Sequence, residues 1–333
     1  MSIRYKDTEY TYISAKVRGM ENSLVGRECL ERMIAAEDTE AAAAYLREYG
    51  LDLVGLSASA REDVLIASLG EGIAQIEKSA PVAGIFTFFR YPYDCSNIKS
   101  LIKCKIRNIP YESLMFSVGS VPIGVLAEHF EKNDFSCLPE NMARATREAI
   151  EAYSKTKNPQ KIDFILDRAC FADMEACANA GGIGIISDMT QMRSDLTNFM
   201  ICLRVLRMEM GNGASEYLKE ALLESGKIGA GAFAAAAGEG EAELIALLER
   251  RGYKKLSSKL SVGCELSYAE KLCDNERTAL IKKAKHVTFG VEIPLAYIAA
   301  LETEIQNIRI VLAGKDAKIP AEIISERIRE CYV

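Results

Sequence analysis

The stretch DCSNIKSLIKCKIRNIPYESL, residues 94–114, guides the prediction of the fold because its pattern returns near the end of the chain. The stretch EIQNIRIVLAGKDAKIPAEII, residues 304–324, aligns with it without a gap. The matched pairs are Asn97 with Asn307, Ile98 with Ile308, Lys105 with Lys315, Pro110 with Pro320, Glu112 with Glu322, and Leu114 with Ile324. Agreement of this length predicts a structural repeat.

A third copy lies between these two. DLTNFMICLRVLRMEMGNGASEYL, residues 195–218, also begins with acid-x-x-Asn followed by an apolar residue, and it has MGNG where the other copies have a proline turn. The three copies begin at Asp94, Asp195 and Glu304. This spacing predicts three related helical domains, approximately 1–115, 116–220 and 221–333, with the N- and C-terminal helices free to pack together. Standard solenoids repeat every 20 to 50 residues or so and are disfavoured.

The repeated acid and asparagine have an expected structural role. Residues three apart share one face of a helix, so each pair lies beside the apolar stripe of its helix. From there the two side chains can hydrogen-bond to the end of a neighbouring helix. The pairs Asp94/Asn97, Asp195/Asn198 and Glu304/Asn307 are therefore expected to specify the fold, and the alternative is that they contact a partner.

The rest of the chain favours helices. No proline occurs between Pro159 and Pro294, and helix-forming residues fill that interval. Segments such as ENMARATREAIEAYSK and EAELIALLERRGYKKL have apolar residues at spacings of three and four, as amphipathic helices do. Only VAGIFTFF, residues 82–89, could form either a short strand or part of a helix. The predicted fold class is all-α.

Composition narrows the class of protein. The chain has 333 residues, 49% hydrophobic content and a net charge of -6, so it has ample core and no general attraction to nucleic acid phosphates. It begins without a signal peptide pattern and contains no apolar run of membrane-spanning length, which predicts a cytosolic protein. Ten cysteines lack any C-x-x-C pair and the only histidines are His129 and His286, so reduced thiols and no zinc site are expected.

Several motifs in order resemble one family. They are YTYISAKVRGMENSLV near the start, YDCSNIKSLIKCK, IDFILDRACFADM, LAYIAALETEIQNIRIVLAGK, and ISERI near the end. Together they resemble the C subunit of the archaeal and bacterial V/A-type rotary ATPases, the counterpart of the d subunit in the eukaryotic vacuolar enzyme. The family tends to have an aromatic pair in the third motif, whereas this chain has Ala169 and Cys170 before the single aromatic Phe171.

This resemblance implies a mechanical function. It implies three helical domains in a funnel or trefoil arrangement, on the cytoplasmic face of the membrane rotor ring. There the family forms the socket for the central stalk and transmits torque for ATP-linked proton or sodium transport. The expected partners are the central-stalk subunits and the rotor ring of c/K-type subunits. No catalytic group, cofactor or metal is expected in such a part.

Nucleotide and cofactor binding find no support in the motifs. ESGKIGAG contains Gly-Lys but lacks both the upstream glycine and the hydroxyl residue of a phosphate-binding loop. AGGIGIIS lacks the third glycine of a dinucleotide-binding fingerprint and follows a helix instead of a strand.

The strongest enzymatic alternative is a magnesium site. Asp163 and Asp167 stand four apart on one expected helix face and could hold Mg²⁺ for a diphosphate substrate. No matching acidic cluster appears elsewhere, and Lys161 and Arg168 lie nearby in sequence, which favours solvated ion pairs. His129 lacks an identifiable nucleophile partner. An unrelated helical adaptor is the other alternative.

Overall fold

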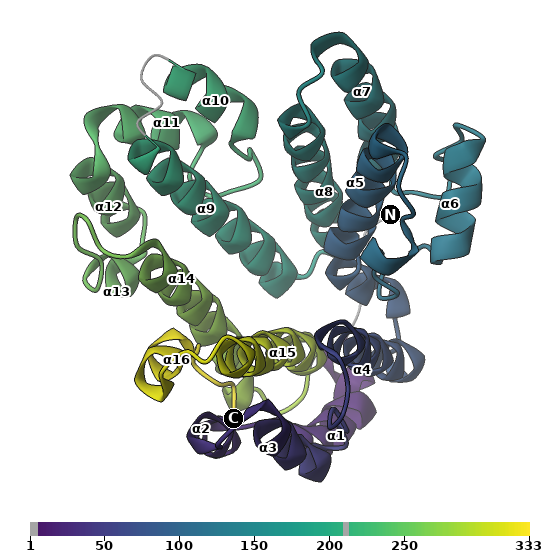
Figure 1. The fold of residues 1–333 in the computed structure, drawn as a ribbon, viewed down its shortest axis with the longest axis vertical. Coiled ribbons are helices and arrows are strands. Elements are labelled where there is room, and N and C mark those ends of the chain that lie inside the picture. Colours follow the sequence, from purple (N-terminus) through teal and green to yellow (C-terminus); the bar gives the residue numbers. More distant parts are fainter. Residues whose placement is uncertain (1–5, 209–212) are drawn as a thin grey trace. The chain divides into compact units, whose positions relative to one another are not determined.

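The regular structure of the chain is helical throughout the part that the computed structural model describes, residues 6–208 and 213–333 (Figure 1). No strand occurs in these residues, and the prediction of an all-α fold is confirmed. The ambiguous segment at 82–89 forms the 3₁₀-helix η4 (Ala83–Phe89). The predicted MGNG turn at 210–213 falls almost wholly outside the described residues.

The chain divides into two compact units. The middle unit is Ile85–Leu266, and the terminal unit combines residues 6–84 with Ser267–Val333. The three-part division at 115 and 220 stays a prediction. The middle unit contains the helices α5 (Tyr91–Arg107), α6 (Ile123–Glu131), α7 (Glu140–Thr156), α8 (Gln160–Gly181), α9 (Gly184–Arg207), α10 (Gly213–Ala221), α11 (Ala230–Glu239), α12 (Glu241–Arg250) and α13 (Lys254–Ser257), with η5 (Glu112–Leu114) between α5 and α6.

Two groups of helices make up the middle unit. In the first, α8 packs against α7 and α5, and α6 lies beside α5 (Figure 1). In the second, α9 packs against α10, α11 and α12. Apolar side chains at helical spacing fill both groups, among them Ile98 and Leu101 on α5 and Phe199 on α9. Burial of such faces is the main stabilising contribution to helix packing.

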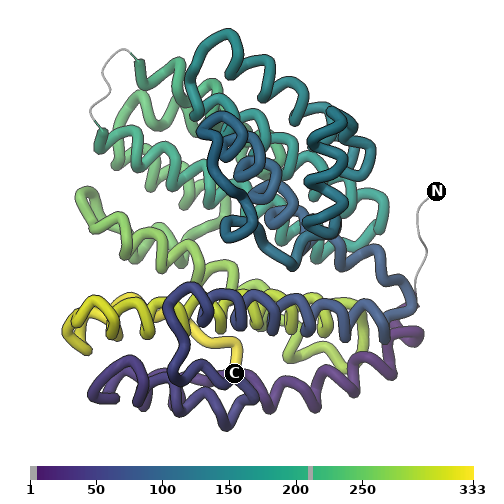
Figure 2. Tube along the Cα trace, turned by 45° about the vertical axis from the view of Figure 1, so that its right-hand side comes forward, coloured from purple at the N-terminus to yellow at the C-terminus, as the bar shows by residue number. Residues whose placement is uncertain are grey.

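The terminal unit is built from both ends of the chain. Its helices are α1 (Thr11–Met20), α2 (Arg27–Ala35), α3 (Thr39–Ala44), α4 (Ala58–Ser79), α14 (Leu266–Ile281), α15 (Glu292–Asp316) and α16 (Ala321–Arg327), with the 3₁₀-helices η1 (Asp7–Tyr10), η2 (Glu21–Ser23), η3 (Tyr45–Tyr49) and η6 (Lys282–His286). The long helix α15 packs against α1, α2, α3 and α4 (Figure 2). More than half of α15 is buried, so it is the core of this unit.

No helix in the described part of the chain is both long and apolar enough to span a bilayer.

Candidate functional site

The repeated helices α5 and α15 end in the same way. A residue just past the end of each helix adopts a left-handed conformation, Asn108 with φ 52° and Lys318 with φ 55°. Pro110 and Pro320 follow two residues later, where the ring prevents the helix from continuing. The constant offset between the two copies in the sequence therefore coincides with a shared backbone conformation.

Hydrogen bonds complete the same cap in both copies. The Ile109 N–H donates to the carbonyl of Cys104 at 3.1 Å, and the Ile319 N–H donates to the carbonyl of Gly314 at 2.8 Å. A bond of this type satisfies a carbonyl that the helix end would otherwise leave without a partner. The sequence stretch that predicted the repeat thus includes a complete helix terminator.

Each of the three repeated asparagines holds one later residue through both atoms of its side-chain amide. The Oδ1 atom accepts from that residue's N–H and the Nδ2 atom donates to its carbonyl. We call this pair of bonds a clamp. The clamped residues are Phe116 for Asn97 (2.7 and 2.9 Å), Leu223 for Asn198 (2.8 and 2.8 Å) and Arg329 for Asn307 (2.8 and 3.2 Å). All three asparagines are buried. The bonds to Leu223 and Arg329 are buried and those to Phe116 are part-buried, so each clamp satisfies backbone groups that have little or no access to water.

Asp94 fixes the loop that follows the first clamp. Its carboxylate accepts from the Ser120 hydroxyl at 2.6 Å and from the Val121 N–H at 3.2 Å. Burial raises the pKa of Asp94, and these two bonds oppose the rise because they stabilise the charged form. A side chain at Gly119 would place its Cβ 2.5 Å from Asp94 Oδ1, so the close approach of this loop requires glycine.

Asp195 makes the matching contacts after the second clamp. It accepts from the Ile228 N–H at 2.9 Å and from the Tyr253 hydroxyl at 2.8 Å. Burial again raises the pKa of Asp195 against the effect of these bonds. A Cβ at Gly226 would lie 2.1 Å from Asp195 Oδ1, which makes Gly226 the counterpart of Gly119.

The loops that carry these contacts share a pattern that the sequence reasoning missed. Residues 116–121 read FSVGSV and residues 223–228 read LESGKI, with the clamped residue, the glycine and the N–H donor at the same spacing in both. The second loop is the Gly-Lys segment that was compared with a phosphate-binding loop. Comparison of FSVGSV with LESGKI would have revealed this shared loop pattern. The motif apolar-x-x-Gly-x-(Val/Ile) follows each of these two acid-x-x-Asn helices.

The third copy receives its acid contact from a distant part of the sequence. Glu304 Oε2 accepts from the N–H of Val25 at 2.7 Å, 279 residues away along the chain. Tyr332 stands three residues after the clamped Arg329, where the other copies have glycine. The segment between η2 and α2 thus supplies the donor that a downstream loop supplies in the first two copies.

Asp163 and Asp167 do not form an open metal site. Both lie on α8 and are paired with lysines of α5, Lys103 Nζ to Asp163 at 2.6 Å and Lys99 Nζ to Asp167 at 2.6 Å. These cations occupy the positions that Mg²⁺ would need. The pairing differs from the local one expected from sequence, because Lys161 instead contacts Glu220 on α10 at 3.1 Å. Nowhere in the described residues do three possible metal ligands gather.

His129 does not have the surroundings of a catalytic base. Its Nδ1 lies 3.0 Å from Asp134 Oδ2, within the turn that ends α6. Its side chain is 30% exposed, and this contact joins it to a carboxylate and not to a hydroxyl or thiol that it could activate. The geometry is that of a local structural contact.

Two shallow cavities occur in the terminal unit. One, of about 260 Å³, lies between α4 and α15 and is bordered by two ion pairs, Arg61 with Asp316 at 2.5 Å and Arg309 with Glu62 at 2.8 Å. The guanidinium groups of Arg61 and Arg309 are therefore already neutralised by these carboxylates. The other, of about 470 Å³, lies beside Arg18, whose guanidinium is taken up by Glu21 and by backbone carbonyls. The residues that line these two cavities do not bring together a nucleophile and a base.

Comparisons with known proteins agree with the sequence resemblance. The family model of the ATP synthase (C/AC39) subunit matches residues 13–327. The C subunit of the V-type sodium ATPase of Enterococcus hirae is 22% identical over 328 residues, which cover 97% of this chain and 99% of that protein. The C subunit of the A-type ATP synthase of Pyrococcus abyssi is 22% identical over 345 residues, which cover 98% of this chain and 92% of that protein. The similarity extends over nearly the whole chain.

Proposed function

The chain belongs to the ATP synthase (C/AC39) subunit family, and from that premise we propose that it is the socket coupling a central stalk to a membrane rotor ring. The match over residues 13–327 carries the proposal, and the names of two full-length relatives, the C subunits of a V-type and of an A-type enzyme, support it. As a non-catalytic part of a V/A-type ATPase, it transmits torque between ATP-driven and ion-driven parts.

The pattern of polar contacts suits a part that transmits torque. A rotor component must resist bending, and close-packed helices resist small changes of volume. The three clamps add directional bonds, because each ties a long helix to one defined backbone residue. In this proposal Asn97, Asn198 and Asn307 keep equivalent junctions rigid, and they contact the protein's own backbone instead of a partner.

The clamps also support a common origin for three parts of the chain. Each part would consist of a long helix, α5, α9 or α15, with the segment that its asparagine holds. We therefore retain the three-domain repeat, approximately 1–115, 116–220 and 221–333, as a proposal, and the bond from Val25 to Glu304 ties the N-terminal segment to the third part.

The proposed location is the cytoplasmic face of the membrane, where the chain would rest on the ring as a peripheral part of the rotor. Its partners would be stalk subunits on one side and ring subunits on the other. Each durable contact of this kind should bury at least about 1,000 Å².

Affinity capture tests the coupling role. The tagged chain is recovered from membranes of its own organism after gentle detergent treatment, and the retained proteins are identified and quantified by mass spectrometry. We expect stalk and ring proteins together in fixed ratio. Recovery of the chain alone, or with unrelated soluble proteins, would contradict the proposal.

Reconstitution separates the two contacts. Purified ring in detergent and purified stalk proteins are each mixed with the chain, and complexes are detected by size-exclusion chromatography with light scattering. Binding to both is expected. A matched control is Gly231→Ala, since the added methyl at this α11 position meets no atom within 4 Å beyond the backbone of its own helix and its chain neighbours, and should leave both complexes intact.

A further inference from the structure

Positive charge is concentrated at the end of α12 and around α13. The stretch RRGYKKLSSK, residues 250–259, contains Arg250, Arg251, Lys254, Lys255 and Lys259. No aspartate or glutamate occurs from 250 to 264, although the chain as a whole has a net charge of -6. An attraction of this region to an anionic surface would therefore be local and not a property of the whole chain.

The fold directs most of these cations into solvent. Arg251, Lys254, Lys255 and Lys259 are all exposed, and we call these four residues the basic patch. The apolar residues Leu256 and Leu260, which lie among them in sequence, are buried. Arg250 is left out of the patch because its guanidinium pairs with Glu243 on α12.

The basic patch lacks the acidic partners that other exposed lysines have. Lys132 pairs with Glu128, and Lys155 pairs with Glu151. Among the residues that the structure describes, none forms an ion pair with a member of the patch. Like charges crowded in this way repel one another and give the fold no stabilising contact. Folding alone therefore does not explain the patch.

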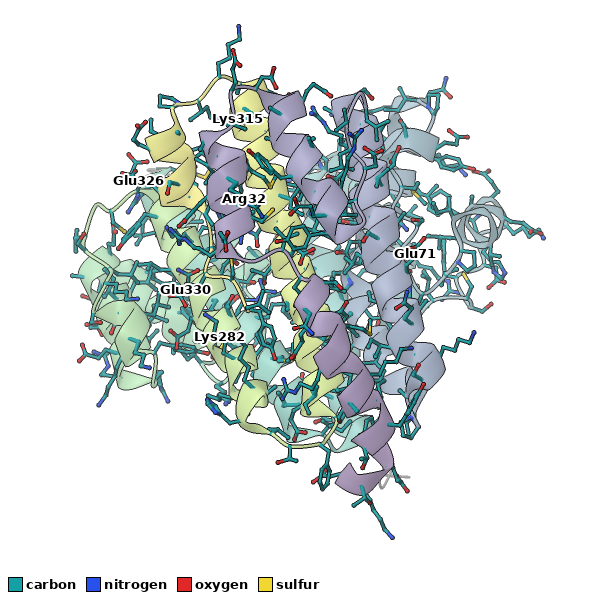
Figure 3. The ribbon with its side chains drawn as sticks, turned by 90° about the horizontal axis from the view of Figure 1, so that it is seen from below. Arg32, Glu71, Lys282, Lys315, Glu326 and Glu330 are labelled. Carbon is teal, nitrogen blue, oxygen red and sulfur yellow. The ribbon has the colours of Figure 1, made fainter. Side chains whose placement is uncertain are left out.

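A second lysine-rich segment shows the difference. The 3₁₀-helix η6 reads KKAKH, residues 282–286, and two of its three lysines have partners. Lys282 lies 3.5 Å from Glu330, and Figure 3 shows both residues on one face of the terminal unit. The ammonium of Lys285 lies 4.8 Å from the centre of the Tyr332 ring. Basic sequence by itself thus does not leave lysines unpaired in this protein.

The segment that carries the patch is held firmly in the middle unit. The Tyr253 hydroxyl, just before α13, donates to the buried Asp195 at 2.8 Å. After α13, the Gly263 N–H donates to Glu241 on α12 at 3.0 Å. Between these two attachments lies Val262, whose side chain is apolar and 64% exposed. The patch and this apolar residue therefore belong to one short, anchored segment.

We propose that the basic patch and Val262 bind the surface of an anionic lipid bilayer. Clusters of lysine and arginine near an anionic leaflet are attracted to its headgroups, and an adjoining apolar side chain adds a second contribution. Neither of the two cavities described above is lined by these residues, which favours a surface over an enclosed ligand. The inference does not rest on the rotor function, since it concerns lipid alone.

The composition of the patch favours lipid over an acidic protein segment. Three of its four members are lysines, whose hydrated ammonium groups sit on flexible stems. Such groups suit a fluid layer of phosphates, whereas the fixed carboxylates of a protein are better matched by the rigid fork of arginine.

Vesicle co-sedimentation of the full chain tests the proposal. We expect binding to vesicles of phosphatidylcholine and phosphatidylglycerol in equal parts, no binding to phosphatidylcholine alone, and weaker binding as salt is added. The triple variant Lys254→Gln/Lys255→Gln/Lys259→Gln should bind on the order of a hundredfold more weakly, since each lysine near the leaflet contributes roughly fivefold. Absence of wild-type binding to the anionic vesicles would overturn the proposal.

A second triple variant controls for net charge. Lys132→Gln/Lys155→Gln/Lys227→Gln removes the same charge from exposed lysines that pair with acids, so it should bind as the wild-type chain does. Equal weakening by both triple variants would show that only the overall charge matters, and the patch would not be a site.

A fluorescent residue tests the role of Val262 directly. The chain contains no tryptophan, so Val262→Trp introduces a single indole. Its emission should shift to shorter wavelength on the anionic vesicles, because the ring enters the boundary between headgroups and acyl chains. Val125→Trp, at a 40% exposed position on α6 in the other group of helices, should show no shift. Equal shifts at both positions would indicate unspecific adsorption and contradict the proposal.

The capture experiment described above separates this inference from the rotor function. If the wild-type chain recovers stalk and ring proteins but does not bind the anionic vesicles, the rotor function stands and the lipid site is wrong. If, in addition, Lys254→Gln/Lys255→Gln/Lys259→Gln loses one of those proteins, the patch is a contact for an acidic protein surface.

Discussion

The first and third copies of the repeated helix place the same asparagine clamp in two different settings. In the first, Asp94 and Asn97 hold a loop that begins 19 residues after the asparagine. In the third, Asn307 holds Arg329 but Glu304 reaches Val25, at the other end of the sequence. The asparagine contact is thus the part of the motif that both copies share. The acid differs between them, because Asp94 accepts from Ser120 and Val121 whereas Glu304 accepts from Val25.

This difference teaches that the two residues of the motif have separate roles. The asparagine satisfies both polar groups of one backbone residue, a requirement that is the same wherever the helix is buried. The acid attaches the next element, and which element that is depends on the local chain path. Mutations can therefore test the constant and the variable part independently.

The largest effect is expected from removing the constant part. Asn97→Leu, Asn198→Leu and Asn307→Leu should each lower the free energy of unfolding by about 3 kcal/mol, because each leaves the N–H and the carbonyl of a buried or part-buried residue without the amide that holds them. Urea unfolding followed by circular dichroism measures the loss. The three losses should be similar.

An unequal result would break the comparison. If one leucine variant kept wild-type stability but lost its complex with stalk or ring, that asparagine would be a contact for a partner and not a clamp. The separate capture and reconstitution measurements distinguish these outcomes.

The glycines beside the acids give the next largest effect. Gly119→Ala and Gly226→Ala should each cost about 2 kcal/mol, since the new methyl would overlap a buried, hydrogen-bonded carboxylate. The control Gly231→Ala should be neutral or stabilising by up to about 1 kcal/mol because that helical site is open. Equal behaviour of all three in thermal unfolding would mean that the loops can shift freely.

Sequence alone predicted the constant part better than the variable part. The helices, the three acid-x-x-Asn copies and the family could be predicted because hydrophobic periodicity and repeated motifs can be recognised in the sequence without knowing which segments are in contact. The contact between Glu304 and Val25 could not, since it joins residues 279 apart. The pairing of Asp163 with Lys103 was missed for the same reason, as the two helices become neighbours only in the fold.

The acids themselves should respond in opposite directions to the same chemical change. At pH 7.5, Glu304→Gln should stabilise the chain by about 1 kcal/mol, because it removes a charge held by a single amide. Asp94→Asn should destabilise it by about 1 kcal/mol, because the new amide NH₂ replaces an oxygen that accepts from Ser120 or Val121.

The pH dependence sharpens that contrast. Folding raises the pKa of Glu304, so wild-type stability falls as pH rises from about 4.5 to about 7. The gain from Glu304→Gln should accordingly shrink as pH is lowered toward 5.5 in urea unfolding at each pH. A gain that grows toward low pH would have the wrong sign and would contradict the assignment of the raised pKa.

The smallest effects concern the lysines that occupy the rejected metal site. The side chain of Lys99 is 18% exposed, and its Nζ lies 2.6 Å from Asp167 and 3.9 Å from Asp163. The side chain of Lys103 is 39% exposed and pairs with Asp163 but not with Asp167. Lys99→Met should therefore cost about 1 kcal/mol and Lys103→Met about 0.5 kcal/mol or less, because exposed ion pairs contribute little.

Magnesium provides the decisive measurement on the same cluster. With both lysines present, millimolar Mg²⁺ should leave the melting temperature of the chain unchanged, since the ammonium groups already neutralise the carboxylates. Saturable stabilisation by Mg²⁺ in the wild-type chain, but not in Asp163→Asn, would revive the enzymatic alternative. If the melting temperature stays unchanged, the lysines and not the helix spacing decide whether this cluster binds a metal ion. Two carboxylates four residues apart bind a cation only where no basic side chain of the protein already pairs with them.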